Sequence, residues 1–472
     1  MVLNFRSLQR LRALRAERKI FVYRIFFGVA LAAPILFGGG ALQGRVSESI
    51  CIVAALPLLA LVIGGAQRST SRLGPLPILI LSGVGFLVVL QLVPLPPAVW
   101  SALPGRSAFR EAFEFAGSVV PWQPVSLNPG TTTRAFLSLI APVAIFLGTG
   151  RLDQDGRITA LWMILSIAVA SFLLGVSQML GGPDSILRFY SITSTASAVG
   201  FFANANHNAA YLYCCPPLAA ALYLASKRRV RNVIFLGFIA VTALALLITR
   251  SRTGLALGVA SIVFALWIAF QHQVRTIRRS YVAAGAAAAL ILCIPLVIGF
   301  GLFDVTARVA GDTLSGDERW SILKGATHAA WALFPVGSGL GTFSQIYPFY
   351  EGVGEVSGTF INRAHDDWLE LVIEAGAGAV ALLALWVIWL LQRSIEVLKQ
   401  GLRNQTFAAA GLACAWLLTA HSLWDYPLRT QALATLLAFC AALALPKHSS
   451  AAVAPHAVRG PESGPARDFR VG

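Results

Sequence analysis

The chain has 472 residues, of which 57% are hydrophobic and only 12% are charged, and its mean hydropathy is +0.71. Soluble globular proteins carry about 25% charged residues, so this composition excludes an ordinary soluble domain and indicates a membrane protein. The net charge of +16 is also seen in nucleic-acid-binding proteins. Here the cations follow a membrane topology, as shown below, and we expect no nucleic-acid partner.

Twelve apolar runs are candidate transmembrane helices, since a span needs about 20 mostly apolar residues. The first run follows a basic segment, but it is long for a cleaved signal peptide and we expect a retained helix. The fold class predicted is therefore an all-α polytopic membrane protein with about 12 transmembrane helices. The runs lie at approximately 21–38, 48–66, 75–93, 134–149, 158–180, 207–225, 232–249, 254–271, 281–300, 367–392, 406–421 and 428–446.

The cations alternate between the gaps that separate these runs. One set of alternate gaps, which includes both ends of the chain, holds 24 Lys and Arg residues, and the longer gaps of the other set hold 11. Positively charged loops stay in the cytoplasm, so we expect both termini to be cytoplasmic. The predicted divisions are a basic cytoplasmic N-terminus (1–20), helices one to nine (21–300), a large outward loop (301–365), helices ten to twelve (366–446) and a disordered cytoplasmic tail (447–472).

The large outward loop is long enough to indicate a function. It contains several aromatic residues that would let it fold onto the membrane surface, and a short helix is expected from Glu318 to Leu333. Arg319 and Lys324 on this helix would face a cavity or the lipid headgroups. A salt bridge between Arg319 and a nearby acid is the alternative.

The turn between the seventh and eighth runs, Thr249-Arg250-Ser251-Arg252-Thr253-Gly254, holds two arginines on the outward side. Arginines there oppose the positive-inside bias, which favours a function. Guanidinium groups form bidentate contacts with phosphate oxygens, and we expect Gly254 and the free N–H groups of the next helix to add affinity for an anion. Snorkelling of arginines at a helix end is the alternative.

Two further clusters contain histidine. Asn204-Ala205-Asn206-His207-Asn208 opens the sixth run, where one Asn can cap the helix and the others, with His207, would bind substrate. His365 precedes the tenth run, where the helix dipole favours the neutral ring that a general base requires. The adjacent Asp366 and Asp367 oppose that effect. A surface histidine beside solvated acids is the alternative.

Buried carboxylates and a final polar turn complete the candidate residues. Glu370 and Glu374 share one helical face, and two carboxylates within a span are costly unless they meet cations or water. His421, Asp425 and Arg429 lie in the last outward turn, where they complete a polar pocket or pair with one another. The six cysteines show no metal-ligand spacing and are expected to pack as small apolar residues.

Taken in order, these elements resemble the O-antigen ligase/polymerase superfamily of bacterial membrane glycosyltransferases. The resemblance covers roughly residues 195–430, and the N-terminal third carries only topology. Asp366 departs from the Asn that often follows the histidine in this family. The matching elements are Asn-His at 204–208, S-R-T-G at 251–254, R-W-x-x-x-x-x-A at 319–326, G-x-G-x-G-T-F-x-x-x-Y-P at 337–348 and A-H-D-D-W-L-E-L-V-I-E-A-G at 364–376.

The resemblance implies a multi-pass protein of the bacterial cytoplasmic (inner) membrane, with the large partly helical loop in the periplasm. It implies a metal-independent, cofactor-free transferase that takes an undecaprenyl-pyrophosphate-linked glycan as donor. By position, Arg250, Arg252 and Arg319 would contact the diphosphate and His365 the acceptor hydroxyl. Weaker candidates for substrate binding are Asn206, His207, Lys324, Glu374 and Arg429.

The acceptor separates the subtypes of this family. Lipid A core would make the chain an O-antigen ligase, a second lipid-linked glycan an O-antigen or exopolysaccharide polymerase, and a protein an O-oligosaccharyltransferase. The sequence does not choose among them. A polysaccharide or lipid-glycan transporter or flippase without transferase activity is the alternative, although its usual internal repeats and midplane charges are not evident.

Overall fold

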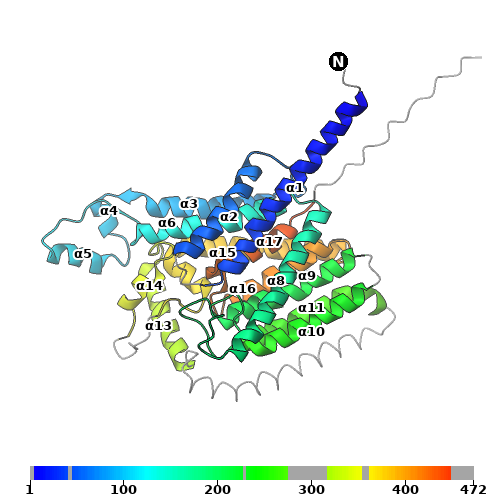
Figure 1. The fold of residues 1–472 in the computed structure, drawn as a ribbon. Coiled ribbons are helices and arrows are strands. Elements are labelled where there is room, and N and C mark those ends of the chain that lie inside the picture. The colour runs from blue at the N-terminus through cyan, green and yellow to red at the C-terminus, as the bar shows by residue number, and fades with distance from the viewer. Residues whose placement is uncertain (1–4, 41–44, 227–229, 275–315, 353–360, 448–472) are drawn as a thin grey trace, which may run out of the picture.

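The structure is a computed structural model that describes the chain except for residues 1–4, 41–44, 227–229, 275–315, 353–360 and 448–472 (Figure 1). Its regular structure is nearly all helical. The first half contains α1 (Phe5–Phe37), α2 (Arg45–Ile63), α3 (Pro75–Leu92), α4 (Pro97–Ser101), α5 (Ser107–Phe115), α6 (Pro129–Ser138), α7 (Ile140–Thr149), α8 (Gln154–Leu180) and α9 (Ala205–Ala225). The second half contains α10 (Arg231–Thr249), α11 (Arg252–Val274), α13 (Gly316–Leu333), α14 (Phe343–Ile346), α15 (Asp367–Gln400), α16 (Thr406–His421) and α17 (Gln431–Leu443).

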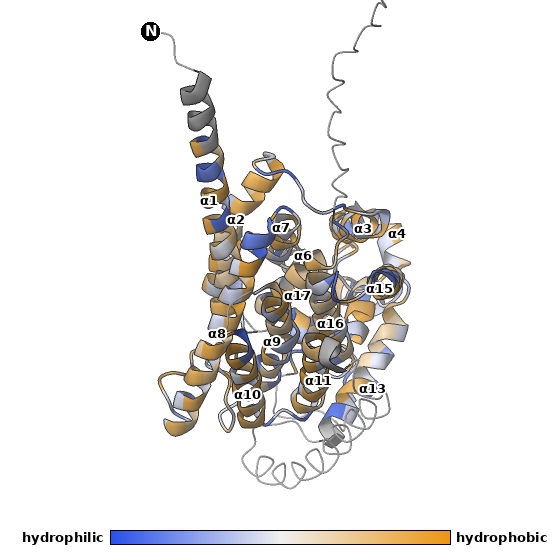
Figure 2. Cartoon of the chain, turned by 90° about the vertical axis from the view of Figure 1, so that its right-hand side faces the viewer, coloured by the Kyte–Doolittle hydropathy of each residue, from blue (hydrophilic) through white to orange (hydrophobic). Residues whose placement is uncertain are grey.

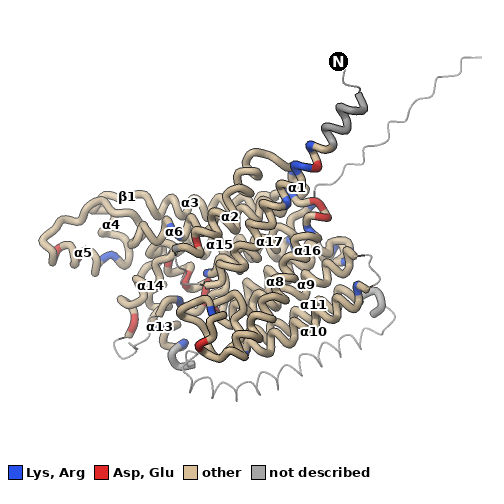
Figure 3. Tube along the Cα trace, in the orientation of Figure 1, with Lys and Arg blue, Asp and Glu red and all other residues tan. Residues whose placement is uncertain are grey.

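Eight helical segments within the described residues are long and apolar enough to cross a membrane. Many of their large apolar side chains are exposed. These helices are mostly coloured hydrophobic in Figure 2, and charged residues are sparse along them (Figure 3). The chain is thus a multi-pass, all-α membrane protein. The predicted count of 12 spans is not confirmed, because α9 is not among the eight segments, α16 and α17 are only 16 and 13 residues long, and the run 281–300 lies outside the described residues.

The fourth predicted run differs from the structure in its start and its continuity. Together α6 and α7 form one span-length segment, Pro129–Thr149, that begins five residues before the predicted run at 134 and bends at Leu139. Pro142 lies in the first turn of α7 and has no N–H to donate to the carbonyl of Ser138, which explains the break. The gap between the predicted runs 75–93 and 134–149 is partly helical, since it contains α4 and α5, and its strands β1 (Pro94–Leu95) and β2 (Gln123–Pro124) pair antiparallel.

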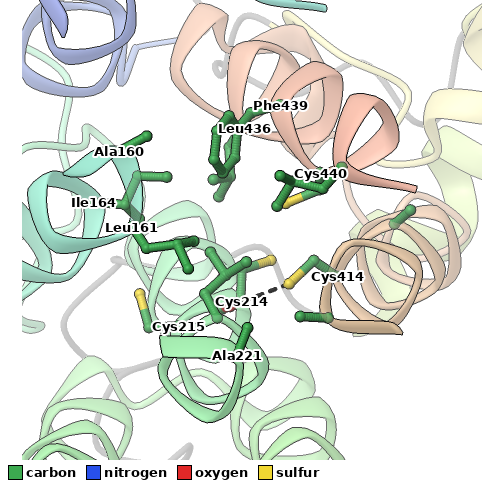
Figure 4. Close-up of a cluster of buried hydrophobic side chains, with 14 of the residues drawn as sticks. Ala160, Leu161, Ile164, Cys214, Cys215, Ala221, Cys414, Leu436, Phe439 and Cys440 are labelled. Atoms are coloured by element: carbon green, nitrogen blue, oxygen red, sulfur yellow. Dashed lines mark hydrogen bonds between the residues drawn. The ribbon is translucent and has the colours of Figure 1, made fainter. Parts of the chain in front are cut away.

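Helix α9 lies at the centre of the bundle, in contact with α8, α10, α11, α16 and α17 (Figures 1 and 2). Most of its residues are buried, so it is covered on all sides rather than along one stripe. Its cysteines pack as predicted: Cys214 and Cys215 lie near Cys414 of α16 and Cys440 of α17, among Leu161, Ile164, Leu436 and Phe439 (Figure 4). The described cysteines are free and buried. The polar residues at the start of α9 are therefore held inside the protein.

A second, smaller apolar core supports an outer cap, by which we mean α13, α14, the 3-10 helix η1 (Tyr347–Phe349) and the segment 361–366. Residues of α13, α14 and η1 pack in this core against Ile373 of α15. The helix predicted from Glu318 to Leu333 is therefore present as α13. The cap folds onto the first turns of α15, and contact of this loop with the membrane surface stays a prediction.

Helix α15 is broken at Gly376, whose backbone has a φ of 53° and a ψ of −132°. The turn Gly337–Gly341 fills the break: the N–H of Gly339 donates to the carbonyl of Glu374, and the N–H of Ala377 donates to the carbonyl of Pro335. A Cβ on Gly376 would lie 2.1 Å from the Pro335 oxygen, so only glycine fits. The residues before the break form a separate platform, Asp367–Ala375, which carries the candidate site.

Candidate functional site

Side chains from three distant segments meet around the carboxylate of Asp425, where α9 begins and α16 ends. His365 Nδ1 lies 3.5 Å from Asp425 Oδ1, and Asn206 Nδ2 donates to Asp425 Oδ2 at 2.7 Å. His421 Nε2 is 3.9 Å from the same Oδ2 atom. We call this group the Asp425 cluster: Asn206, His207, His365, His421, Asp425 and Tyr426.

The Tyr426 ring separates two of the histidines. His207 and His365 each pack edge-on against it, with ring centroids 4.9 Å away in both cases. His421 is held from the other side by the hydroxyl of Tyr213, 2.9 Å from its Nδ1. Each imidazole is therefore oriented by a neighbouring aromatic or polar group, which is the rigidity that a catalytic or binding constellation needs.

Local backbone structure explains how Asn206 and His365 reach the cluster. Asn204 caps α9, since its side-chain oxygen accepts from the N–H of Asn206 at 2.8 Å, and this leaves the Asn206 amide for Asp425. His365 has a φ of 54°, in the left-handed region that few non-glycine residues adopt. Asp366 then caps α15 by accepting from the N–H groups of Trp368 and Leu369. This sharp turn places His365 beside Asp425 instead of on α15.

The electrostatics of the cluster are set by one buried anion among three imidazoles. Burial alone would raise the pKa of Asp425, but the His365 imidazole and the charge of His207 hold that pKa well below its usual range. Both ring nitrogens of His207 are buried without a hydrogen-bond partner. Asp425 is only 2% exposed at its side chain, whereas His365 is 15% exposed. His365 is therefore the histidine through which an incoming group reaches the carboxylate.

This pair has the arrangement of an oriented general base. With Nδ1 directed at Asp425, the lone pair of Nε2 is available to accept a proton from a hydroxyl group. The separation of 3.5 Å exceeds a usual hydrogen bond, and such contacts commonly tighten only when substrate binds. Within the described residues no three His, Cys, Asp or Glu side chains are arranged to hold a metal ion. Metal independence stays a prediction.

A separate network of ion pairs lies on the platform of α15. Arg429 Nη1 donates to Glu374 Oε2 at 2.8 Å, and its Nε lies 3.3 Å from both Asp367 Oδ1 and Glu370 Oε1. Arg363 Nη1 donates to Glu370 Oε1 at 2.9 Å. The buried carboxylates thus form ion pairs with arginines, which offsets the free-energy cost of burying their charge in a membrane protein.

This network gives two of the expected substrate-binding residues internal partners. Glu374 is fully buried, and its second carboxylate oxygen accepts from the N–H of Phe343 in the outer cap. Arg429 pairs with Asp367, Glu370 and Glu374, but its Nη2 is buried without a hydrogen-bond partner. The network thus joins the outer cap and the turn that carries Arg429 to α15, and a role of Glu374 and Arg429 in substrate binding stays a prediction.

The arginine turn lies beside α9. Arg250 ends α10 with a φ of 56°, Arg252 opens α11, and both side chains are exposed. A Cβ on Gly254 would lie 2.4 Å from the Cβ of Ala209, one turn along α9 from Asn206, so the glycine allows this close contact. The N–H of Gly254, expected to be free for an anion, is instead taken by Ser251 Oγ at 3.0 Å. The anion affinity predicted for this turn therefore depends on the two guanidinium groups and not on the N–H of Gly254.

The two cations predicted on α13 differ in their relation to the cluster. Arg319 is exposed and interacts electrostatically with His421. Lys324 lies with its Nζ 5.9 Å from the Trp320 ring, and within the described residues no hydrogen bond or ion pair joins it to the Asp425 cluster. The structure therefore relates Arg319, but not Lys324, to the Asp425 cluster, and it does so through His421 and not through the predicted base His365.

The sequence indicates Asp425 only as a member of the polar turn from His421 to Arg429, where three ionisable residues interrupt an apolar region. It does not predict the contact of Asp425 with His365, and it indicates no role for Tyr426 or Arg363.

Comparison with known proteins gives one family match. Residues 236–384 match the family model described as O-antigen ligase, a range that contains Arg250, Arg252, Arg319 and His365 but ends before Asp425. No curated protein matches the chain. The family consists of glycosyltransferase-like membrane enzymes. The resemblance to the O-antigen ligase/polymerase superfamily is thus confirmed by the match to this family model over residues 236–384.

Proposed function

We propose that the protein transfers an undecaprenyl-pyrophosphate-linked oligosaccharide onto an acceptor hydroxyl at the periplasmic face of the bacterial inner membrane. The observation that carries this proposal is the partly exposed His365 facing the buried Asp425 carboxylate at 3.5 Å. The exposed arginines of the α10–α11 turn, beside the same end of α9, support an anionic donor. Both termini then lie in the cytoplasm, as the distribution of cations predicts.

In this reaction the acceptor oxygen forms a bond to the anomeric carbon of the donor sugar while the bond from that carbon to the pyrophosphate oxygen breaks. His365 Nε2 takes the proton of the acceptor hydroxyl, and the resulting imidazolium is stabilised by Asp425. Negative charge grows on the departing undecaprenyl pyrophosphate, and the proposal assigns its stabilisation to Arg250, Arg252 and Arg319. Asn206 and His207 then shape the acceptor side of the site through Asp425 and Tyr426.

The acceptor is either lipid A core or a second lipid-linked glycan, which would make the enzyme a ligase or a polymerase. Both acceptors present a sugar hydroxyl, so His365 serves either reaction in the same way. Donor and acceptor are both anchored in the membrane that holds the protein. The proposed reaction needs no cofactor.

The proposal is tested by His365→Ala in the purified full-length protein, with undecaprenyl-pyrophosphate-linked glycan as donor and both acceptors offered separately. Transfer should fall by at least a hundredfold, the usual contribution of a general base. His328→Ala is the matched control, because His328 is an exposed histidine of α13 outside the Asp425 cluster. If His365→Ala and Arg252→Ala both keep full transfer, the proposal fails, and a transporter becomes the better account.

A further inference from the structure

A cavity of about 210 Å³ lies at the end of the bundle opposite the Asp425 cluster. It is formed where α8 and α16 begin and where α9 and α17 end. Its polar lining includes Gln154, Arg157, Asn404 and Lys447, and its apolar lining includes Leu224 and Phe407. None of its described lining residues is acidic. The alternation of cations predicts that this end faces the cytoplasm.

Arg157 is a buried cation in the cavity wall. The residue is 3% exposed, and its Nη2 donates to the hydroxyl oxygens of Thr70 at 3.2 Å and Ser71 at 3.0 Å. These partners are neutral, so they satisfy donors without compensating the charge. Its Nε is buried without a hydrogen-bond partner. A buried guanidinium in this condition is costly unless an anion joins it.

The nearest carboxylate is already engaged. Both oxygens of Asp153 accept from Arg24 Nη2, at 2.8 and 2.7 Å, and Oδ1 also accepts from the N–H of Gly156. Asp153 thus forms a bidentate pair with Arg24 and caps α8. Its charge is shared with Arg24, which leaves the positive charge of Arg157 only partly offset.

Two further features make the cavity electropositive. Burial and the charge of Arg157 lower the pKa of Lys447, which shows that two cations act on the same space. The first turn of α16 also lines the cavity at Thr406 and Phe407, and its N-cap residue Gln405 makes no capping hydrogen bond. The N–H groups of an uncapped first turn carry partial positive charge and bind anions.

We propose that this cavity is a phosphate-binding site, held by Arg157, Lys447 and the first turn of α16. The phosphate belongs either to the headgroup of an anionic phospholipid or to a soluble phosphate compound. Both present the oxygens that a guanidinium Nε–H and an ammonium group recognise. The site is independent of the transfer reaction, because it lies at the other end of the bundle and uses none of the same residues.

The test uses purified full-length protein and two probes. Inorganic phosphate is titrated against sodium chloride of equal ionic strength while thermal unfolding is followed, and a saturable rise in the melting temperature is expected if the ligand is soluble. In parallel, protein taken from nanodiscs of phosphatidylcholine with phosphatidylglycerol is analysed by native mass spectrometry, and a retained phosphatidylglycerol is expected if the ligand is a lipid.

Variants then locate the site. Lys447→Gln removes an exposed cation of the cavity without touching the core and should weaken the bound probe by about tenfold or more, as expected for one charge-assisted contact. A folded Arg157→Gln variant should also bind the probe about tenfold or more weakly. Lys399→Gln removes an exposed cation at the same end outside the cavity and should change binding less than twofold. The proposal is overturned if wild-type protein binds neither probe, or if Lys447→Gln binds as tightly as wild type.

Discussion

Replacing Asp425 by Asn removes one charge from the centre of the proposed site and very little volume. The side chain is 2% exposed and accepts from Asn206 Nδ2 and from the N–H of Tyr426. If the new amide oxygen takes the position of Oδ1, it still accepts from the Tyr426 N–H and still faces His365. The Asn206 amide can rotate to accept from the new NH₂ group. The cluster can therefore keep its contacts while the carboxylate charge is lost.

The expected effect on catalysis follows from the 3.5 Å separation of His365 and Asp425. A carboxylate and an imidazolium at this distance attract by about 5 kcal/mol at an effective dielectric constant of about 20. The Asn oxygen retains part of this interaction as a dipole, so we expect a loss of about 3–4 kcal/mol in the transition state. That loss corresponds to a kcat about 10²- to 10³-fold lower. The KM for the lipid-linked donor should change little, because Asp425 acts on the base.

The assay is transfer of glycan from purified lipid-linked donor, followed by electrophoretic separation of the product at saturating donor. Asp184→Asn is the matched control, since Asp184 is an exposed aspartate of the segment between α8 and α9. Thermal unfolding and size-exclusion chromatography check that each variant is folded. A folded Asp425→Asn variant with kcat within threefold of wild type would refute the idea that Asp425 stabilises the charged form of His365.

Three further predictions concern the arginine turn, its packing and the topology. Arg252→Gln should lower kcat/KM for the lipid-linked donor by about 10- to 100-fold, as for one charge-assisted phosphate contact, and unchanged kinetics would exclude a role in donor binding. Gly254→Ala places a methyl group 2.4 Å from the Ala209 Cβ and should destabilise the protein by about 1–3 kcal/mol, measured as a lower melting temperature; an unchanged value would contradict this packing. Gly352→Cys should react with an impermeant thiol reagent from outside intact cells, against the low background of buried cysteines, and labelling only after lysis would reverse the topology.

The helices could largely be predicted from the sequence because lipid requires long apolar segments. The run predicted at 232–249 is α10 (Arg231–Thr249), and that at 158–180 lies within α8 (Gln154–Leu180). The break in α15 was not predictable in the same way. Gly376 stands in an apolar run that continues on both sides, and its non-helical backbone depends on the turn Gly337–Gly341, which is distant in sequence. Local pattern cannot reveal a break that a long-range contact imposes.

The sequence allowed prediction of which residues belong to the site, but not of which residues contact one another. Polar residues are scarce in this chain, so Asn206, His207 and His365 stand out against their apolar surroundings. Their shared partner Asp425 is 219 residues from Asn206, and its contact with them requires the packing of α9, α15 and α16. The same is true of Glu374, whose ion pair with Arg429 joins residues 55 positions apart in the sequence.

Hydrogen bonds at both ends of the α15 platform fix the position of His365. The platform of α15 is held by Gln91 of α3, whose Nε2 donates to the Glu374 carbonyl, and by Ser338, whose N–H donates to the Ile373 carbonyl. At the other end of the platform, the N–H of Asp367 donates to the Ser422 carbonyl, which ties it to the chain that carries Asp425. His365 and Asp425 are thus held to one another by backbone contacts on either side of the pair. A base held in this way is preorganised, so we infer that donor and acceptor are brought to a fixed His365.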